Sequence, residues 1–278
     1  MNRRQVIEMI INEEGFSPQG LTADALSAYL PAGRLNGVLC LDTVDSTNKR
    51  LREMACENAP AGQVVLANGQ TQGRGRLGRS FLSPEGKGIY LSYLFDLAHQ
   101  QGDVASITAW VAVSVCNAIE NVCGVRPGIK WVNDLLLNQK KICGILTEAL
   151  AEGGCVRQAV IGIGVNVNES EEDFPQELRP IASSLGLWAG RPFCRARLAA
   201  EIIRELDAMA AAWPGEKQRY LTAYRSGCVT VGKVIRVISS QGERPGVATA
   251  VQDDFSLAVN YDDGSSASLS SGEVSVRW

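Results

Sequence analysis

One long segment constrains the fold more than any other feature of this sequence. Between Val104 and Val122 apolar residues recur at helical spacing, and the small residues among them predict a helix that packs flat against a sheet. Short apolar runs bounded by turn residues lie on both sides and predict the strands of that sheet. The predicted strands are Val38 to Leu41, Gln63 to Ala67, Ile89 to Phe95, Gly128 to Trp131, Leu135 to Leu137, Ile142 to Leu150 and Val156 to Val165. The arrangement indicates an α+β domain with a mixed sheet and helices over one face.

The pattern changes twice along the chain and divides it into three parts. Residues 1–36 hold two short helical patterns, Arg4 to Asn12 and Thr22 to Leu30, which are too short to form a domain. Residues 37–226 form the main domain, which a helix from Arg195 to Trp213 is expected to close. Residues 227–278 alternate Val and Ile with polar residues between Gly and Asp turns, which predicts a small β-barrel.

Composition limits the kinds of function open to this chain. The 278 residues carry a net charge of -3, which argues against nonspecific DNA binding by the whole surface. The 8 cysteines include no CxxC pair and only His99 could join them, so we expect buried thiols and no built-in metal site. The amino terminus lacks the apolar stretch of a signal peptide, and no apolar run is long enough to span a membrane. We therefore expect a cytoplasmic protein without a membrane partner.

The strongest chemical signal is the segment GRGRLGR, from Gly73 to Arg79, called the arginine loop below. Its glycines let the backbone approach a ligand closely, and its arginines, Arg74, Arg76 and Arg79, are permanently charged donors for phosphate or carboxylate. Its position between two predicted strands favours an ordered anion-binding loop. A flexible nucleic-acid-binding segment and a solvated turn remain alternatives on spacing alone. No GK[ST] follows, so the loop is not a Walker A phosphate-binding loop.

Two further segments place polar residues or glycines on predicted strands. KWVND, Lys130 to Asp134, ends in Asn133 and Asp134, which are also ordinary hairpin residues. Lys141 directly precedes an apolar strand, so its ammonium is expected to project toward the arginine loop. There it could hold a carboxylate and stabilise the charge that develops as that carboxylate attacks a phosphate. IGIGVN, Ile161 to Asn166, alternates glycine with apolar residues, which indicates close approach to a flat ring or, alternatively, a bulge.

Five motifs in this order resemble the biotin protein ligase family. They are DSTN (Asp45 to Asn48), QxxGRGRxGR (Gln70 to Arg79), KWxND (Lys130 to Asp134), KxxGIL (Lys141 to Leu146) and GxGxN (Gly162 to Asn166). The resemblance runs from about Leu39 to Trp278. It implies that biotin and Mg-ATP give biotinyl-5'-AMP and pyrophosphate, and that a lysine of a biotin carboxyl carrier protein then attacks this mixed anhydride. It also implies an SH3-like fold for the carboxy-terminal barrel.

The resemblance assigns a role to each motif residue. Arg74, Arg76 and Lys141 would act on the reacting carboxyl and phosphoryl groups. Biotin, a substrate rather than a resident cofactor, would contact Ser46, Thr47, Asn48, Gln70, Gly73, Arg74, Arg76, Lys141, Gly144 and Gly162. ATP and the adenylate would contact Arg76, Arg79, Phe81, Asn133, Asp134, Lys141, Asn166 and Arg277. Phe81 would offer the purine an aromatic platform, and Asp134 would assist Lys141 or the Mg2+ that arrives with ATP.

Three departures from the family pattern bear on function. Val132 stands where the family usually has proline, and Leu77 stands where a further arginine is common. The residues before Leu39 are too few for a winged helix-turn-helix, so the chain resembles the ligase-only class and we expect no specific operator binding. Family members dimerise through sheet edges, so a homodimer is an open possibility.

Two other functions compete with this interpretation. A nucleic-acid-binding regulator that clamps phosphates with the three arginines would bind with an affinity that falls steeply with salt. A lipoate-type protein ligase would use the same activation chemistry and differ in the ring that it recognises. Pyrophosphate release with biotin, compared with lipoate, separates the two ligases.

Overall fold

The computed structural model describes residues 20–97, 104–152, 155–239, 242–270 and 275–277. The predicted helix from Arg4 to Asn12 and the single histidine, His99, lie outside these residues. The predicted helix after Thr22 forms as α2 (Ala23–Ser27). The Thr22 hydroxyl accepts a hydrogen bond from the backbone N–H of Ala25 at 3.1 Å, as expected of a helix cap.

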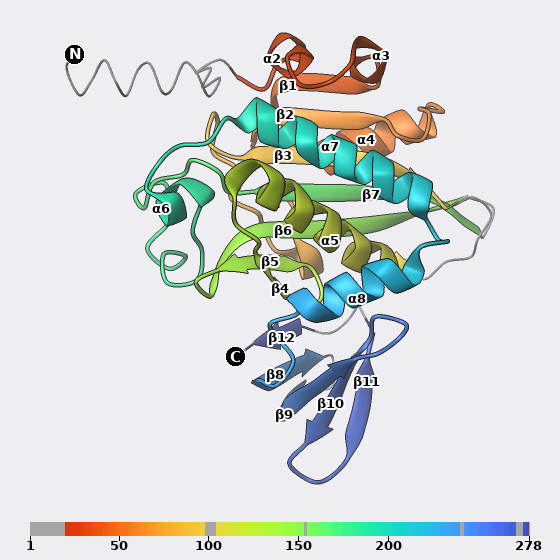
Figure 1. Ribbon diagram of the computed structural model, residues 1–278, viewed down its shortest axis with the longest axis vertical. Coiled ribbons are helices and arrows are strands. Elements are labelled where there is room, and N and C mark those ends of the chain that lie inside the picture. The colour runs from red at the N-terminus through yellow and green to blue at the C-terminus, as the bar shows by residue number, and fades with distance from the viewer. Residues whose placement is uncertain (1–19, 98–103, 153–154, 240–241, 271–274, 278) are drawn as a thin grey trace.

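The main domain is built on a seven-stranded mixed sheet, as predicted (Figure 1). Its strands lie in the order β1-β2-β3-β7-β6-β5-β4. β1 and β2 are parallel, and every other neighbouring pair is antiparallel. The strands are β1 (Val38–Val44), β2 (Val64–Gln70), β3 (Ile89–Asp96), β4 (Gly128–Lys130), β5 (Asp134–Leu137), β6 (Lys140–Glu152) and β7 (Cys155–Val165). Each predicted apolar run of this domain is therefore a strand.

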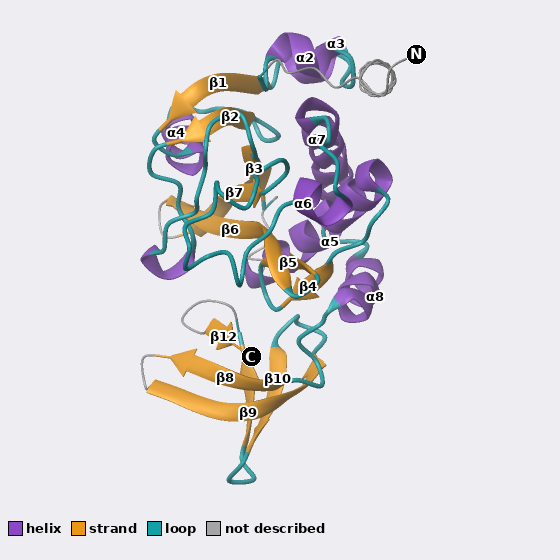
Figure 2. Cartoon of the chain, turned by 90° about the vertical axis from the view of Figure 1, so that its left-hand side faces the viewer, coloured by secondary structure: helices purple, strands orange, loops and turns teal. Residues whose placement is uncertain are grey.

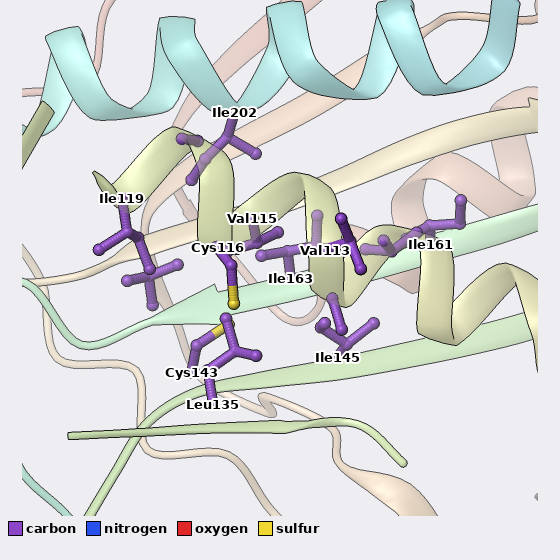
Figure 3. Packing of buried hydrophobic residues seen from close by; sticks show 14 of the residues in the cluster. Val113, Val115, Cys116, Ile119, Leu135, Cys143, Ile145, Ile161, Ile163 and Ile202 are labelled. Atoms are coloured by element: carbon purple, nitrogen blue, oxygen red, sulfur yellow. The ribbon is translucent and has the colours of Figure 1, made fainter. Parts of the chain in front are cut away.

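Two long helices, α5 (Val104–Cys123) and α7 (Arg195–Ala212), cover one face of this sheet. Figure 3 shows the core that the two helices form with the sheet. Side chains of α5 lie between those of the sheet and Ile202 of α7. An 18-residue window of α5, Ser106–Cys123, has the length and mean hydropathy (1.2) of a membrane span, but 78% of it is buried inside the protein. This burial identifies α5 as a core helix.

The expectation of helices over one face only is wrong, because α4 (Thr47–Cys56) lies across the opposite face (Figure 2). Leu51 of α4 packs with Val65, Leu94 and Val160 in a separate small cluster. Side chains alternate along a strand, so the neighbours of these residues in the same strands point into the larger core under α5. Strands that are apolar at successive positions need cover on both faces, and α4 supplies the second cover.

A helix after α7 was not predicted. α8 (Lys217–Gly227) packs against α5, so the main domain does not close with α7. The buried residues of α8 are Tyr220, Leu221 and Tyr224 in an otherwise polar segment, which leaves a weak apolar stripe. Two short helices, α3 (Ala32–Leu35) and α6 (Leu185–Ala189), were also not predicted.

The carboxy-terminal residues form a second, antiparallel sheet of five strands in the order β11-β10-β9-β8-β12. The strands are β8 (Val234–Ser239), β9 (Gly242–Val251), β10 (Leu257–Tyr261), β11 (Ser266–Leu269) and β12 (Ser275–Arg277). Trp131, which follows β4, joins the two sheets. Its indole Nε1 donates to the carbonyl of Phe255 at 3.0 Å, and its backbone N–H donates to Thr230 Oγ1 at 2.8 Å. The second sheet is thereby fixed beside the ends of β4 and β5.

The expectation that the cysteines are buried thiols holds only in part. Cys116, Cys123 and Cys143 are buried, and burial raises the pKa of the Cys123 thiol to about 12. Cys56 is exposed, because the last turn of α4 faces solvent. Cys40, Cys194 and Cys228 are half-buried. A thiol held above its ordinary pKa stays protonated near neutral pH and is a poor nucleophile.

Candidate active site

A small cavity forms where β1 and β2 end and α4 begins. The chain leaves β1 at Val44 and enters α4 at Thr47, so the DSTN side chains lie beside the end of β2 at Gln70. β6 and β7 contribute their glycines to the same space. The cavity, called the first cavity, has a volume of about 50 Å³. Its lining residues are Ser46, Thr47, Asn48, Gln70, Arg74, Gly75, Arg76, Phe81, Asn133, Lys141, Gly144, Ile145, Leu146, Gly162, Ile163 and Gly164.

The polar end of the first cavity is held by a continuous hydrogen-bond network. The backbone N–H and the hydroxyl of Thr47 both donate to Gln70 Oε1, at 2.9 and 3.1 Å, and Gln70 Nε2 donates to Ser83 Oγ at 2.9 Å. Ser92, which is fully buried on β3, lies within 2.8 Å of Thr47 Oγ1 and 2.5 Å of Asn48 Oδ1. These bonds fix the orientation of the side chains that a ligand would meet.

The glycines of β6 and β7 allow two side chains to lie directly on the sheet. A Cβ at Gly162 would lie 2.2 Å from Asn48 Oδ1, and a Cβ at Gly164 would lie 2.5 Å from the ring of Phe81. Gly144 is paired with Gly164 across the two strands, and the register is regular there. The glycines therefore serve close approach, which was one of the two interpretations of the IGIGVN segment, and the alternative of a bulge is wrong.

The arginine loop is an ordered hairpin. Arg74 pairs with Ser80 in an antiparallel bridge, and the N–H of Gly75 donates to the carbonyl of Arg79 at 2.7 Å. Leu77, at the tip, has a φ of 56°, a left-handed turn conformation. This order favours the anion-binding interpretation over a flexible nucleic-acid-binding segment.

Arg76 is the arginine of this loop that points into the interior. Its Nη1 donates to Asn133 Oδ1 at 3.1 Å, and burial lowers the pKa of its guanidinium, an effect that nearby Arg79 increases and Asp134 opposes. A guanidinium remains charged under any such shift. A half-buried cation that faces the cavity can receive an anion there.

Lys141 lies at the start of β6, on the side of the arginine loop. Its Nζ is 2.7 Å from Asp134 Oδ1 and 5.8 Å from the centre of the Phe81 ring. With Arg74 and Arg76 it lines the first cavity. The predicted convergence of this lysine with the arginine loop is therefore present in the structure.

Two further cavities continue from the first one toward the second sheet. The connecting cavity, of about 100 Å³, shares Arg76, Phe81, Asn133 and Lys141 with the first cavity. The wide cavity, of about 570 Å³, begins at Phe81, Lys141 and Asp134 and has a largely apolar wall. Its lining residues are Arg79, Ser80, Phe81, Leu82, Lys130, Asp134, Leu136, Gln139, Lys141, Asn166, Phe174, Leu178, Ile181, Ala182 and Arg236. A molecule with a small part in the first cavity and a larger part in the wide cavity could thus place the bond that joins the two parts beside Lys141.

The structure places Gly73, one of the predicted residues, outside these cavities. Gly73 lies under the hairpin, where a Cβ would be 2.3 Å from the carbonyl of Phe81. It lines a separate groove on the outer side of the arginine loop and none of the three cavities. Arg277 lies in β12 opposite Arg236, and its side chain is outside the described part. Arg236 itself lines the wide cavity and was not predicted, because its strand shows only the ordinary alternation of a surface strand.

Comparison with known proteins agrees with the motifs and the fold. The model of the biotin/lipoate A/B protein ligase family matches residues 40–166. The bifunctional ligase/repressor BirA of Bacillus subtilis is 37% identical over 230 residues, which cover 80% of this chain and 69% of that protein. The biotin–[acetyl-CoA-carboxylase] ligase of Mycobacterium tuberculosis is 32% identical over 238 residues, which cover 82% of this chain and 85% of that protein.

A solved structure extends the agreement to both sheets. The biotin protein ligase of Aquifex aeolicus in complex with biotin and ATP superposes with a TM-score of 0.75 at 27% identity, covering 86% of this chain and 98% of that chain. This structure therefore shares the fold over 86% of this chain, and the sequence relatives match 80% and 82% of it. The chain belongs to the biotin/lipoate A/B protein ligase family.

Proposed function

We propose that this protein is a biotin protein ligase, which forms biotinyl-5'-AMP from biotin and ATP and transfers biotin to a lysine of a biotin carboxyl carrier protein. The observation that carries the proposal is the junction of the three cavities, where Arg76 and Lys141 lie together. A carboxylate is a poor acyl donor; in adenylation one of its oxygens attacks the α-phosphorus of ATP and displaces pyrophosphate, and the resulting mixed anhydride can release AMP when a lysine amine attacks the acyl carbon. The junction supplies the positive charge that this step needs.

The first cavity would bind the bicyclic ring of biotin. Thr47 and Gln70 offer hydrogen-bonding groups at its closed end, and Ser46 and Asn48 lie beside them. Gly144 and Gly162 let the side chains of Lys141 and Asn48 lie close to the sheet, where both line the cavity that would hold the ring. The acyl chain would then extend toward Arg74, Arg76 and Lys141. The ring would be recognised by polar groups and the carboxylate by charge.

The wide cavity would bind ATP. Phe81 presents an aromatic side chain between the first and wide cavities, Asn166 lines the wide cavity, and Arg79 and Arg236 bring positive charge to it. Arg277, directly opposite Arg236 on the neighbouring strand, would add to this charge.

We further propose that residues 227–278 are an SH3-like barrel domain, residues 37–226 the catalytic domain and residues 1–36 a short helical segment. With these domain boundaries, the carboxy-terminal domain would contribute Arg236 and Arg277 to the part of the wide cavity that binds the phosphates of ATP.

Lys141 and Arg76 would hold the biotin carboxylate against the α-phosphate and neutralise the charge that grows on both groups. Asp134 keeps the Lys141 ammonium in place at 2.7 Å. The described residues include no group of three or more metal-ligating side chains. Mg2+ would arrive with ATP, since this ion commonly takes one carboxylate together with substrate phosphates. Asp134 is the residue that would contribute such a carboxylate.

The direct test is ATP-dependent pyrophosphate release with biotin and with lipoate, followed by transfer of biotin to a purified carrier domain. Release with biotin and labelling of the carrier lysine are expected. Release with lipoate alone would replace the proposal by a lipoate-type ligase. Absence of release with either acid, together with salt-sensitive DNA binding, would favour the nucleic-acid-binding regulator.

Replacing Arg76 by alanine is expected to reduce kcat/KM for adenylate formation about 100-fold, equivalent to about 3 kcal/mol. The reason is the loss of a half-buried guanidinium that lines the first cavity and that Asn133 holds in place. Pyrophosphate release measures the effect. The matched control is Arg219→Ala, which removes an arginine from an exposed ion pair on α8 and should leave the rate unchanged. A wild-type rate for Arg76→Ala would show that the role is misassigned.

The arginine loop is expected to become less accessible to trypsin when biotin and ATP bind. The first cavity, at about 50 Å³, is far smaller than the roughly 300 Å³ at which ligand pockets usually begin. The loop is therefore expected to open before the ring enters and to close over it afterwards, and its tip at Leu77 is exposed. Mass spectrometry of fragments cut after Arg74, Arg76 and Arg79 measures the protection. Equal cleavage with and without substrates would contradict a moving loop.

The remaining proposals concern partners and location. We propose a cytoplasmic enzyme without a membrane partner and without specific operator binding. A gel-shift with biotinyl-AMP and the organism's own biotin operator tests the second point. Tight, sequence-specific retardation would contradict it.

A further inference from the structure

Glu148, on β6, lies where three polar side chains from different parts of the chain meet. Its Oε2 accepts a hydrogen bond from Asn48 Nδ2 at 2.8 Å. Its Oε1 accepts one from Arg52 Nη2 at 2.7 Å and lies 3.6 Å from Arg74 Nη1. The glutamate thus contacts two residues that line the first cavity, Asn48 and Arg74, without lining that cavity itself.

The carboxylate of Glu148 determines which way the amide of Asn48 points. An ionised carboxylate can only accept hydrogen bonds, so it must face the NH₂ group of the amide and not its oxygen. The opposite end of the same amide, Oδ1, faces the buried hydroxyl of Ser92 at 2.5 Å. Asn48 is therefore held from both ends, and its face toward the cavity is fixed.

Glu148 also compensates positive charge at the base of the arginine loop. Arg52 and Arg74 both approach the same carboxylate oxygen, one from α4 and one from the loop. Without the carboxylate the two guanidiniums would repel each other. Arg74 would then leave the position in which it lines the first cavity.

We propose that Glu148 is a positioning residue for biotin, acting through Asn48 and Arg74. This inference rests on the proposed function, since it assigns the first cavity to the biotin ring. The glutamate does not touch the ligand. Its effect should therefore fall on the binding of biotin and not on the binding of ATP, whose cavity it does not line.

The chain provides a matched control in Arg52. Its guanidinium makes the shorter of the two ion pairs with Glu148 but lines none of the three cavities. If Glu148 served only to anchor α4 to β6, the Arg52→Ala variant would show the same change in kinetic constants as the Glu148→Ala variant. If it positions Asn48 and Arg74, removal of Arg52 should have little effect on biotin binding, because both residues keep their contacts with the carboxylate.

The experiment measures the KM for biotin, the KM for ATP and kcat by pyrophosphate release. Glu148→Ala is expected to raise the KM for biotin by about 10- to 100-fold, the loss typical of a charged hydrogen bond. The KM for ATP should change less than about twofold, as should all three constants in Arg52→Ala. Glu148→Asp, which keeps the charge, should recover part of the affinity. Glu148→Gln keeps the shape of the side chain and serves if the alanine variant does not fold.

An unchanged KM for biotin in Glu148→Ala would overturn the proposal. Equal losses in Glu148→Ala and Arg52→Ala, or equal increases in both KM values, would overturn it as well and assign a structural role. These results differ from a failure of the proposed function itself, in which the wild-type protein would release no pyrophosphate with biotin.

Discussion

Replacing Lys141 by alanine is expected to lower the rate of biotinyl-adenylate formation about 1,000-fold, or about 4 kcal/mol of transition-state stabilisation. Lys141 lines all three cavities that meet at the junction. Negative charge must approach negative charge there when the carboxylate attacks the phosphate. An ammonium held in place by Asp134 neutralises both groups without first having to reorganise.

The neighbouring lysine provides the control for this prediction. Lys140 precedes Lys141 on the same strand, but its Nζ donates to the carbonyl of Arg179 at 2.8 Å and lines none of the three cavities. Lys140→Ala removes the same charge and should leave adenylate formation within about twofold of the wild-type rate. Single-turnover pyrophosphate release distinguishes the two variants. Similar rates for both would remove Lys141 from the catalytic step.

The sheet was predictable because its strands are apolar runs with clear boundaries. β2 is buried at nearly every position, so the run at Gln63 to Ala67 was recognisable as a buried strand. The same run did not indicate that α4 covers the second face of the sheet. A continuous apolar run indicates that both faces are buried, but not which element covers each face. α8 was missed because tyrosines make up most of its buried stripe. Local patterns thus predicted the elements, and tertiary packing decided how they cover one another.

Some residues of the candidate site could likewise be predicted from the sequence, and others could not. Arg76 and Lys141 were recognisable because permanent or compact positive charge beside glycines points to an anion. Glu148, Ser92 and Arg236 were not, because each acquires its role from a neighbour that is remote in sequence. Glu148 and Asn48 stand 100 residues apart and meet only because β6 and α4 lie on the same part of the sheet. No spacing in the sequence records that contact.

Glu169 is a further residue whose environment no motif predicts. Glu169 is 2% exposed, and its carboxyl group lies near backbone groups of Val167 and Glu169 without a well-formed hydrogen bond within the described part of the chain. The nearby hydroxyl of Tyr90 donates instead to the carbonyl of Pro84 at 2.9 Å. Burial raises the pKa of Glu169 to about 7, and Asp173 adds to this rise, while nearby backbone amides and Arg195 offset part of it.

This raised pKa predicts how stability depends on pH. Between the ordinary pKa of 4.5 and about 7 the unfolded chain has lost the Glu169 proton while the folded chain retains it. The folded state therefore binds more protons, and the free energy of unfolding falls as pH rises through this interval. The total loss is about 3 kcal/mol, from a shift of roughly two to three pKa units. Above pH 7 the loss is complete and the slope from this group ends.

Glu169→Gln removes the ionisable group and should abolish this loss. At pH 8 the variant is expected to be about 3 kcal/mol more stable than the wild-type protein, and near pH 4.5 the two should be nearly equal. Denaturant unfolding at both pH values measures the difference, in which the contributions of all other titrating groups cancel. Glu171→Gln, which changes an exposed glutamate two residues further on, is the control and should leave stability unchanged at both pH values. A Glu169→Gln variant that is less stable than wild type at pH 8 would mean that the carboxylate is ionised and well partnered in the folded protein.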